Sequence, residues 1–203
     1  DWSSDVCSSD LEDMSDGTKE IKKMFTVQAD RVLCTLARDG VYYVKKSYVQ
    51  QKYQETAWIF REAYDFFTAH ASEILSKPLE AESPVWLFGD PVWALPDPGT
   101  HRLQIEIPKE EVLLFDRRKW NRILNLSYVG TKEEEQEFDA RMKKQGVMDA
   151  SDVFAKPYYP QLKAEIKKSW RRLFDDFHEE KMDVKDIQGA SWCLKKEWIS
   201  AKK

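Results

Sequence analysis

The chain has 203 residues, of which 33% are charged and 13% aromatic, and its formal net charge is −4. Eight tryptophans and ten phenylalanines indicate a globular core and exclude an intrinsically disordered chain. No apolar run approaches the roughly 20 residues that cross a bilayer, and no secretory signal follows Met24, so we expect a cytoplasmic protein without a membrane partner.

The first 23 residues differ from the rest. Residues 1–11 resemble the translation of a sequencing-library adapter, although a flexible acidic, serine-rich tail is the alternative. Lys19 and Glu20 can be encoded by a ribosome-binding sequence, so we expect Met24 to be the natural start and residues 12–23 to be leader. Residues 24–203, expected to form one domain, then hold 29 acidic and 29 basic side chains. This balance does not favour a nucleic-acid partner, although a local basic patch stays open.

Cysteine and histidine spacing argues against a metal site. Cys34 and Cys193 are the cysteines of residues 24–203, and they form no CxxC pair. We therefore expect a reducing compartment and no zinc, with Cys34 as a small core residue on an apolar helix face. The three histidines show no metal-ligand spacing either.

The first half of the chain alternates strand and helix. Residues 25–28 and 41–44 are rich in strand formers, and residues 29–39 between them have a helical period that Gly40 ends. Residues 55–75 carry apolar side chains at three- and four-residue spacing, which predicts a core helix. We place the following side chains on its buried face: Ala57, Trp58, Phe60, Tyr64, Phe67, Ala71 and Ile74. A buried strand follows over residues 84–88.

The segment from residue 89 to residue 125 is the most informative. Five prolines or glycines make residues 89–100 a loop, and loops of this length are often functional. Leu103, Ile105 and Ile107 alternate with polar residues, which predicts a half-buried strand. Residues 112–115 are continuously apolar, as in a buried strand, and Asp116 is a good cap for a helix after it.

The second half is mainly helical. Thr131 caps a charged helix ending near Gly146, which we interpret as a solvated appendage. Pro160 starts the last long helix, whose apolar face extends to Phe177, and residues 187–194 form a closing strand that would pair with the first strand near the centre of a sheet. This order predicts an α+β domain with a mixed, mostly antiparallel sheet packed against helices.

Candidate site residues are polar groups on or beside these strands, because no phosphate-binding glycine loop, HExxH or GxSxG motif is present. Thr26 and Gln28 share one face of the first strand, where they either hydrogen-bond at a strand edge or bind the amide or ribose of a ligand. Glu106 faces away from its apolar neighbours, as a solvent-facing carboxylate or, in a cleft, as a base. Gln188 and Trp192 share a face of the closing strand, as a ligand-facing pair or a strand edge.

The helices offer further candidates. Trp120 is a core anchor or a stacking platform, and Asn125 suits a helix C-cap. Arg171 and Arg172 extend a basic stripe that begins at residue 167. This stripe is a solvated face or a phosphate-binding surface.

The chain resembles a bacterial family known as a domain of unknown function, over nearly everything from Met24 to the end. The resemblance rests on residues 25–28, 40–42, 84–86, 106–108, 112–114, 124–125, 168–170 and 188–190, with Asp116, Trp120, Phe174 and Trp192. It implies no established activity.

A weaker resemblance is to the ADP-ribosyltransferase-like superfamily, in the strand, helix and glycine turn of residues 25–44 and in the closing strand with Gln188. It implies an NAD-binding cleft, with Thr26 and Gln28 standing where that superfamily offers His or Arg to the ribose. The leading hypothesis is thus a domain that binds NAD or another nucleotide, which requires Gln28, Glu106 and Gln188 to converge in one pocket. Its residues are Glu106 and Gln188 as catalytic groups, Thr26 and Gln28 as polar contacts, and Trp86 or Trp192 as stacking rings.

The alternative is a non-catalytic module, associated with defence or toxicity, that recognises a protein or a nucleic acid. It would use the loop of residues 89–100 and the basic stripe of residues 167–172. Arg171 and Arg172 would then carry the binding.

Overall fold

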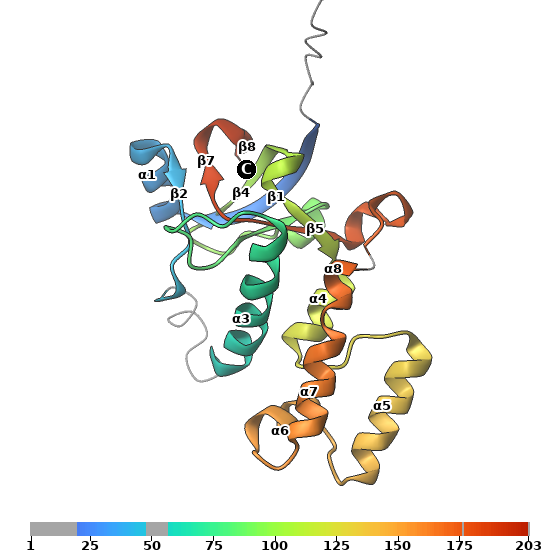
Figure 1. Ribbon diagram of the computed structural model, residues 1–203. Helices are drawn as coiled ribbons and strands as arrows, with labels where there is room; N and C mark the ends of the chain where they lie inside the picture. Colours follow the sequence, from blue (N-terminus) through green and yellow to red (C-terminus); the bar gives the residue numbers. More distant parts are fainter. Residues whose placement is uncertain (1–19, 48–56, 176, 203) are drawn as a thin grey trace, which may run out of the picture.

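Figure 1 shows the computed structural model, which describes residues 20–47, 57–175 and 177–202. The strands are β1 (Ile21–Ala29), β2 (Val41–Tyr42), β3 (Val85–Phe88), β4 (Thr100–Pro108), β5 (Leu113–Asp116), β6 (Ile187–Ser191), β7 (Leu194–Lys195) and β8 (Ile199–Lys202). The helices are α1 (Asp30–Asp39), α3 (Ala57–Ile74), α4 (Arg117–Leu124), α5 (Lys132–Lys144), α6 (Ala150–Ala155), α7 (Pro160–Ser169) and α8 (Arg172–Asp175). The expected positions 55 and 56 of the core helix lie outside the described residues.

The main sheet has six strands in the order β5-β6-β3-β1-β4-β8, and each of its pairings is antiparallel. The longest pairing joins β1 to β4, from Ile21 opposite Pro108 to Ala29 opposite Thr100. β2 and β7 form a separate two-stranded sheet. The α+β class is thus confirmed. The expected pairing of the first strand with the closing strand is wrong, because β3 lies between β1 and β6.

Two apolar clusters hold the sheet between its helices. Met24, Ile105 and Leu103 on β1 and β4 pack with Val32 and Leu36 of α1 in one cluster. The other gathers aromatic side chains, and Phe67, Phe115, Phe138 and Trp170 are among its most buried members. Each such side chain contributes roughly 1.5–3 kcal/mol by leaving water.

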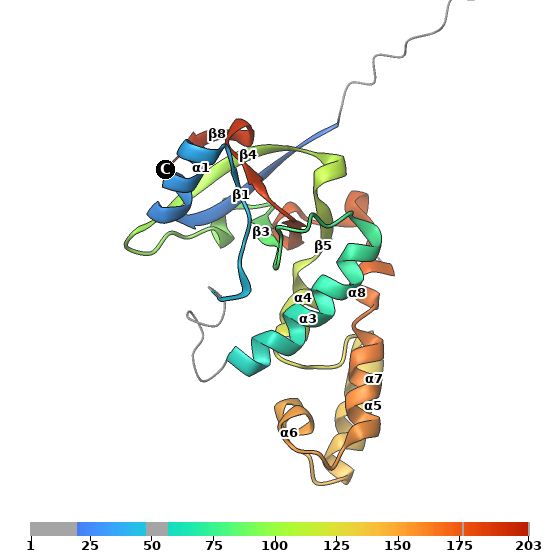
Figure 2. The same ribbon diagram turned by 60° about the vertical axis from the view of Figure 1, so that its left-hand side comes forward.

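The helices after α1 extend to one side of the sheet. Figure 1 shows the sheet in the upper part of the view and α3 to α8 below it, and Figure 2 shows α3 running beside α4 and α8. α3 also contacts α4 directly. The first helix, α1, stays at the upper end of the molecule, beside β2, which it contacts.

Local signals fixed several helix ends as expected. Gly40 ends α1 with φ 76°, and its N–H donates to the carbonyl of Leu36 at 3.0 Å. Asp116 accepts from the backbone N–H of Arg118 at 2.8 Å, which confirms it as the cap of α4. Thr131 and Glu134 form a reciprocal capping box at the start of α5.

Other expectations about the helices are corrected. Cys34 is exposed, because it lies two residues from both Val32 and Leu36 and so turns away from the buried face of α1. Trp58 and Ile74 are also exposed, at 38% and 57%, because the buried stripe of α3 is narrower than the sequence pattern.

α5 and the segment after Pro160 also differ from the prediction. α5 is no mere appendage, since it buries Phe138 and Met142. The long helix is broken at Trp170 into α7 and α8, and α6 precedes it without having been predicted. Phe177 belongs to neither helix.

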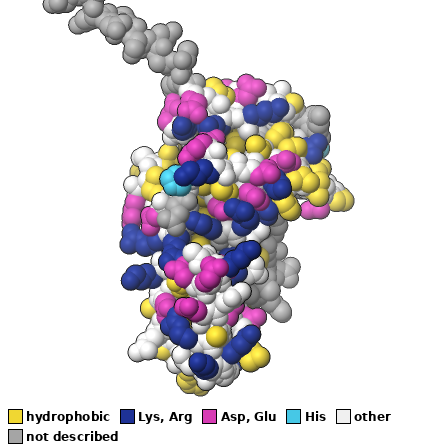
Figure 3. Space-filling model, turned by 90° about the vertical axis from the view of Figure 1, so that its right-hand side faces the viewer, with side chains coloured by type: hydrophobic (Ala, Val, Ile, Leu, Met, Phe, Trp, Pro, Cys, Tyr) yellow, Lys and Arg dark blue, Asp and Glu magenta, His cyan; other side chains and the backbone are white. Residues whose placement is uncertain are grey.

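Charged side chains of both signs are interspersed over the face shown in Figure 3. Many of them form ion pairs, such as Arg122 with Glu135 at 2.8 Å and Lys163 with Glu62 at 3.0 Å. That pattern accords with the near-zero net charge of residues 24–203.

Candidate ligand groove

A groove of about 950 Å³ opens where β1 and β3 separate. These two strands share one registered pair, Phe25 opposite Phe88. Next to that pair, a side chain replaces the backbone hydrogen bonding between the two strands. The hydroxyl of Thr26 donates to the carbonyl oxygen of Trp86 at 2.9 Å. The groove is lined from β1, β3, α3, α4 and the loop of residues 89–100.

Polar side chains from distant parts of the chain meet in this groove. The amide of Gln28 donates to the hydroxyl of Thr26 at 2.8 Å, so that Gln28, Thr26 and the Trp86 carbonyl form one hydrogen-bonded series. Gln188 enters from β6, opposite Phe88. Thr26, Gln28 and Gln188 were predicted to lie near one another, and the fold brings them to one groove.

One buried polar side-chain atom in the groove lacks a hydrogen-bond partner among the residues that the structure describes. It is the Ser83 hydroxyl, in a residue that is 2% exposed. Gln188, a residue that is 4% exposed, lines the same groove. A buried polar group without a partner costs about 1–3 kcal/mol, so such groups are retained where a ligand or water satisfies them.

One wall of the groove is aromatic. The rings of Trp86 and Trp120 are stacked, with centroids 4.8 Å apart and planes 28° apart. Tyr64 of α3 adjoins both, at 5.2 Å from Trp86 and 6.0 Å from Trp120. Trp120 is 2% exposed and anchors the core, whereas Trp86 is half-buried. Trp86 is therefore the ring of this pair that is more available to a planar ligand.

A positive charge stands at another part of the lining. The guanidinium of Arg117 lies 3.8 Å from the centroid of the Trp93 ring, and both side chains line the groove. Arg117 also donates to the carbonyl of Lys185 at 3.2 Å and lies 3.6 Å from an oxygen of Asp186. Stacking and hydrogen bonds thus fix its orientation.

Asp116 next to it stays ionised. Burial acts to raise the pKa of its carboxyl, but hydrogen bonds from the side chain and backbone of Arg118 outweigh burial and lower that pKa. The side chain of Arg118 also approaches Asp186 at 3.4 Å.

Glu106 does not join the groove. It is exposed on β4, opposite Lys23 of β1, and it alternates with the buried Ile105 and Ile107. Thr26 pairs with Leu103, which shares a face with those isoleucines, so Glu106 points to the opposite face of the sheet from Thr26. Gln28, Glu106 and Gln188 were predicted to converge on one pocket. Gln28 and Gln188 do line the same groove, but Glu106 does not.

Trp192 also lies elsewhere. It is 4% exposed within the aromatic cluster, and its ring N–H donates to the carbonyl of Leu75 at 2.8 Å. The side chain anchors the C-terminal end of α3 to the sheet.

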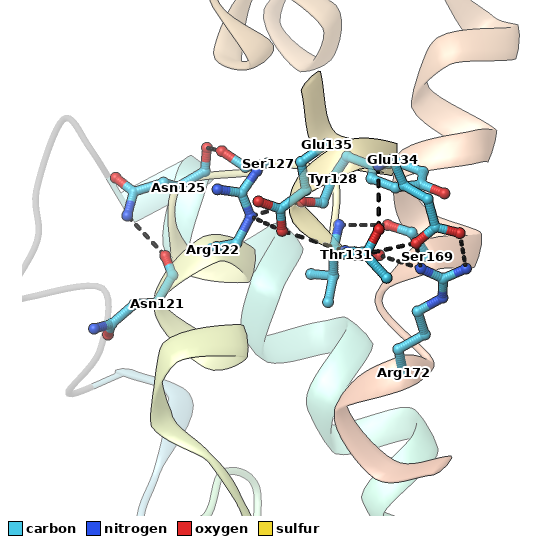
Figure 4. Close-up of polar contacts among 12 residues, drawn as sticks. Asn121, Arg122, Asn125, Ser127, Tyr128, Thr131, Glu134, Glu135, Ser169 and Arg172 are labelled. Carbon is cyan, nitrogen blue, oxygen red and sulfur yellow. Dashed lines mark hydrogen bonds and ion pairs between the residues drawn. The ribbon is translucent and has the colours of Figure 1, made fainter. Parts of the chain in front are cut away.

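Figure 4 shows why Asn125 and Arg172 have structural roles. Asn125 is the C-cap of α4 with φ −93°, and its amide donates to the carbonyl of Asn121 at 2.7 Å. The left-handed residue expected at Asn125 is Leu126, with φ 54°. Arg172 forms a two-point ion pair with Glu134, one contact being 2.9 Å. The hydrogen bond from Arg172, with that from the Thr131 backbone, lowers the pKa of Glu134 to about 2.

Ser83, Arg117 and Tyr64 line the groove but were not predicted from the sequence to do so. Ser83 has no local signal, because its place depends on the bridge between Val44 and Ser83. Nothing distinguishes Arg117 from the other basic residues at the start of α4, and nothing distinguishes Tyr64 from the other aromatic residues of α3.

Among the residues that the structure describes, no three His, Cys, Asp or Glu side chains are grouped so as to hold a metal ion. No helix in the described part of the chain has the length and apolar character needed to cross a bilayer.

The fold and groove define an α+β protein with a candidate ligand site and no recognised catalytic motif. Residues 23–200 match the family described as Domain of unknown function (DUF3841), and the chain belongs to that family. No curated protein and no solved structure matches the chain. The comparisons therefore give no support to the resemblance to ADP-ribosyltransferases.

Proposed function

We propose that the groove between β1 and β3 binds a nucleotide, with NAD among the candidate ligands. The observation that carries this proposal is the meeting of Gln28, Ser83 and Gln188 beside the half-buried ring of Trp86. Ligand sites combine apolar walls with a small number of oriented polar groups, and this groove has that composition.

Each group suits one part of a nucleotide. The ring of Trp86 stacks on a base, as aromatic side chains do with any planar heterocycle. The amide of Gln188 lines the groove and carries both donors and an acceptor, so it pairs with the donor and acceptor edge of a base. Gln28 keeps its orientation through Thr26 and offers its amide oxygen.

Arg117 supplies charge for the phosphates. Its guanidinium is held over Trp93, so little side-chain entropy is lost when a ligand arrives. The carboxylate of Asp186 at 3.6 Å leaves it partly compensated, and a phosphate competes for the same fork of N–H donors.

Glu106 has no part in this binding, because it lies on the opposite face of the sheet from Thr26. Gln188 and Gln28 carry neutral amides that donate and accept hydrogen bonds but do not exchange protons near neutral pH. They therefore position a ligand, and a general base would have to come from elsewhere.

Calorimetric titration with NAD, NADH, ADP-ribose and AMP tests the proposal. We expect saturable binding of at least one of these ligands, and Gln188→Ala should weaken it about tenfold, since a good amide–base pair contributes about 1–3 kcal/mol. Gln161→Ala, at an exposed glutamine of α7, is the matched control and should bind as the unaltered protein does. The idea fails if no nucleotide gives heat at millimolar concentration, or if Gln188→Ala binds normally.

A further inference from the structure

A second cavity, of about 700 Å³, lies between α3 and α7 and is independent of the groove. Trp58, Arg61 and His70 line it from α3, and Lys168 and Arg171 line it from α7 and the residues after it. Tyr64 of the same helix lines the groove instead, so the two sites occupy different faces of α3. We call this second cavity the α3–α7 cleft.

The acidic side chains of the α3–α7 cleft already have partners. Glu62 accepts from Lys167 at 2.6 Å and from Lys163 at 3.0 Å, and Asp65 accepts from Lys46 at 2.9 Å. Burial acts to raise the pKa of Glu62, but the hydrogen bonds from the two lysines outweigh it and lower that pKa. Both carboxylates are thus committed to lysines.

Three cations of the cleft remain without any partner among the described residues: Arg61, Lys168 and Arg171. Lys168 and Arg171 are close in sequence on one wall, and Arg61 belongs to the other. Positive charges gathered in a concave site reinforce one another and attract anions, even on a chain whose formal net charge is −4. The basic stripe of residues 167–172 is therefore divided, with Arg171 facing the cleft and Arg172 paired with Glu134.

Aromatic rings stand beside these cations. Trp58 is 38% exposed and lines the cleft. The ring of His70 lies tilted against that of Phe66, with centroids 4.4 Å apart and planes 33° apart, and both residues line the cleft as well. An exposed ring flanked by cations that no carboxylate satisfies matches the chemistry of a strand of bases joined by phosphates. An acidic peptide would use the cations and leave the ring of Trp58 without a role.

We propose that the α3–α7 cleft binds single-stranded nucleic acid. Arg61, Lys168 and Arg171 contact backbone phosphates, and Trp58 stacks on a base. Recognition is independent of sequence, because the cations contact the phosphodiester backbone and a tryptophan accepts the face of any base.

Fluorescence anisotropy with labelled oligothymidylate and oligouridylate tests this. If three phosphates are contacted, the logarithm of the binding constant should decrease linearly as the logarithm of the salt concentration increases. The expected slope is roughly −2. The triple variant Arg61→Ala, Lys168→Ala, Arg171→Ala should lose at least about tenfold in affinity at low salt and should flatten that slope. Trp58→Ala should weaken binding and leave the slope unchanged.

The matched control removes three exposed lysines of α5 with the same change in charge: Lys132→Ala, Lys143→Ala, Lys144→Ala. Its affinity should stay close to that of the unaltered protein, and both triple variants should keep the circular dichroism spectrum. The proposal is overturned if the chain binds neither oligonucleotide, or if the two triple variants lose affinity equally. It is also overturned if polyglutamate or duplex DNA competes as well as the single strand. AMP binding in the groove should be unchanged in the cleft variant, which separates the two sites.

Discussion

The hydroxyl of Thr26 donates a 2.9 Å hydrogen bond to the main-chain carbonyl of Trp86, at the point where the ladder between β1 and β3 stops. That bond lets two neighbouring strands separate without leaving the carbonyl unsatisfied. The same hydroxyl accepts from the amide of Gln28. Thr26 therefore bonds β1 to β3 where the groove opens, and it also orients Gln28 in the groove lining.

Replacing Thr26 with valine tests this double role. Valine has nearly the same shape, but it leaves the Trp86 carbonyl and the Gln28 amide without their partner. We expect the free energy of unfolding to fall by about 1–3 kcal/mol, the cost of an unmade buried hydrogen bond. Urea denaturation measures it, and Thr26→Ser, which keeps the hydroxyl, should recover most of the loss. Equal stability of the valine variant and the unaltered protein would contradict the role assigned to the hydroxyl.

Phe138 gives a second test, on the helix that the sequence predicted to be solvated. It is 1% exposed, and its ring stacks on Tyr128 with centroids 4.7 Å apart and planes 17° apart. Truncating such a residue costs about 3–5 kcal/mol, so Phe138→Ala should lower the denaturation midpoint strongly. Glu137→Ala, one residue away on the exposed side, should change it little. If both variants behave alike, α5 does not pack as described.

Local signals predicted much of the fold. Gly40, Asp116 and Thr131 act within one turn of chain, so their effect on helix ends is readable from the sequence. Strand alternation likewise placed Ile105 and Ile107 inside. Strand order was not readable, because β3 enters between β1 and β6 through contacts between segments far apart in the sequence.

The groove was predicted in part for the same reason. The alternation rule gave the face of Thr26 and Gln28 and the exposure of Glu106, but it did not say which face would border a cavity. Ser83 joins the groove through its bridge to Val44, and no pattern marks a single serine there. Trp58 was assigned to the core because helical periodicity cannot tell a wide apolar stripe from a narrow one with an exposed ring.

The two described cysteines should differ sharply in reactivity. Burial raises the pKa of the Cys193 thiol to about 11, so at pH 8 it is almost entirely protonated and also shielded. Cys34 is exposed on α1. Brief treatment with iodoacetamide, followed by peptide mass spectrometry, should label Cys34 much faster than Cys193, and the two should be labelled alike in denaturant. Comparable labelling in the native protein would show that β6 and β7 open more readily than their burial indicates.

The ion pair between Arg172 and Glu134 predicts a specific dependence of stability on pH. The folded pKa of Glu134, about 2, lies below its ordinary value of 4.5, so the pair stabilises the fold above pH 4.5. That contribution is lost progressively as the pH falls from 4.5 through 2, because below about pH 2 the carboxyl is protonated in both the folded and the unfolded states. Arg172→Ala should therefore reduce stability at pH 7, and the difference from the unaltered protein should shrink towards pH 2. Arg171→Ala, whose side chain has no described carboxylate partner, should show no such narrowing. Denaturant titrations at several pH values measure the stability of both variants. If the difference in stability between Arg172→Ala and the unaltered protein stays constant with pH, the effect of Arg172 comes from packing and not from the ion pair.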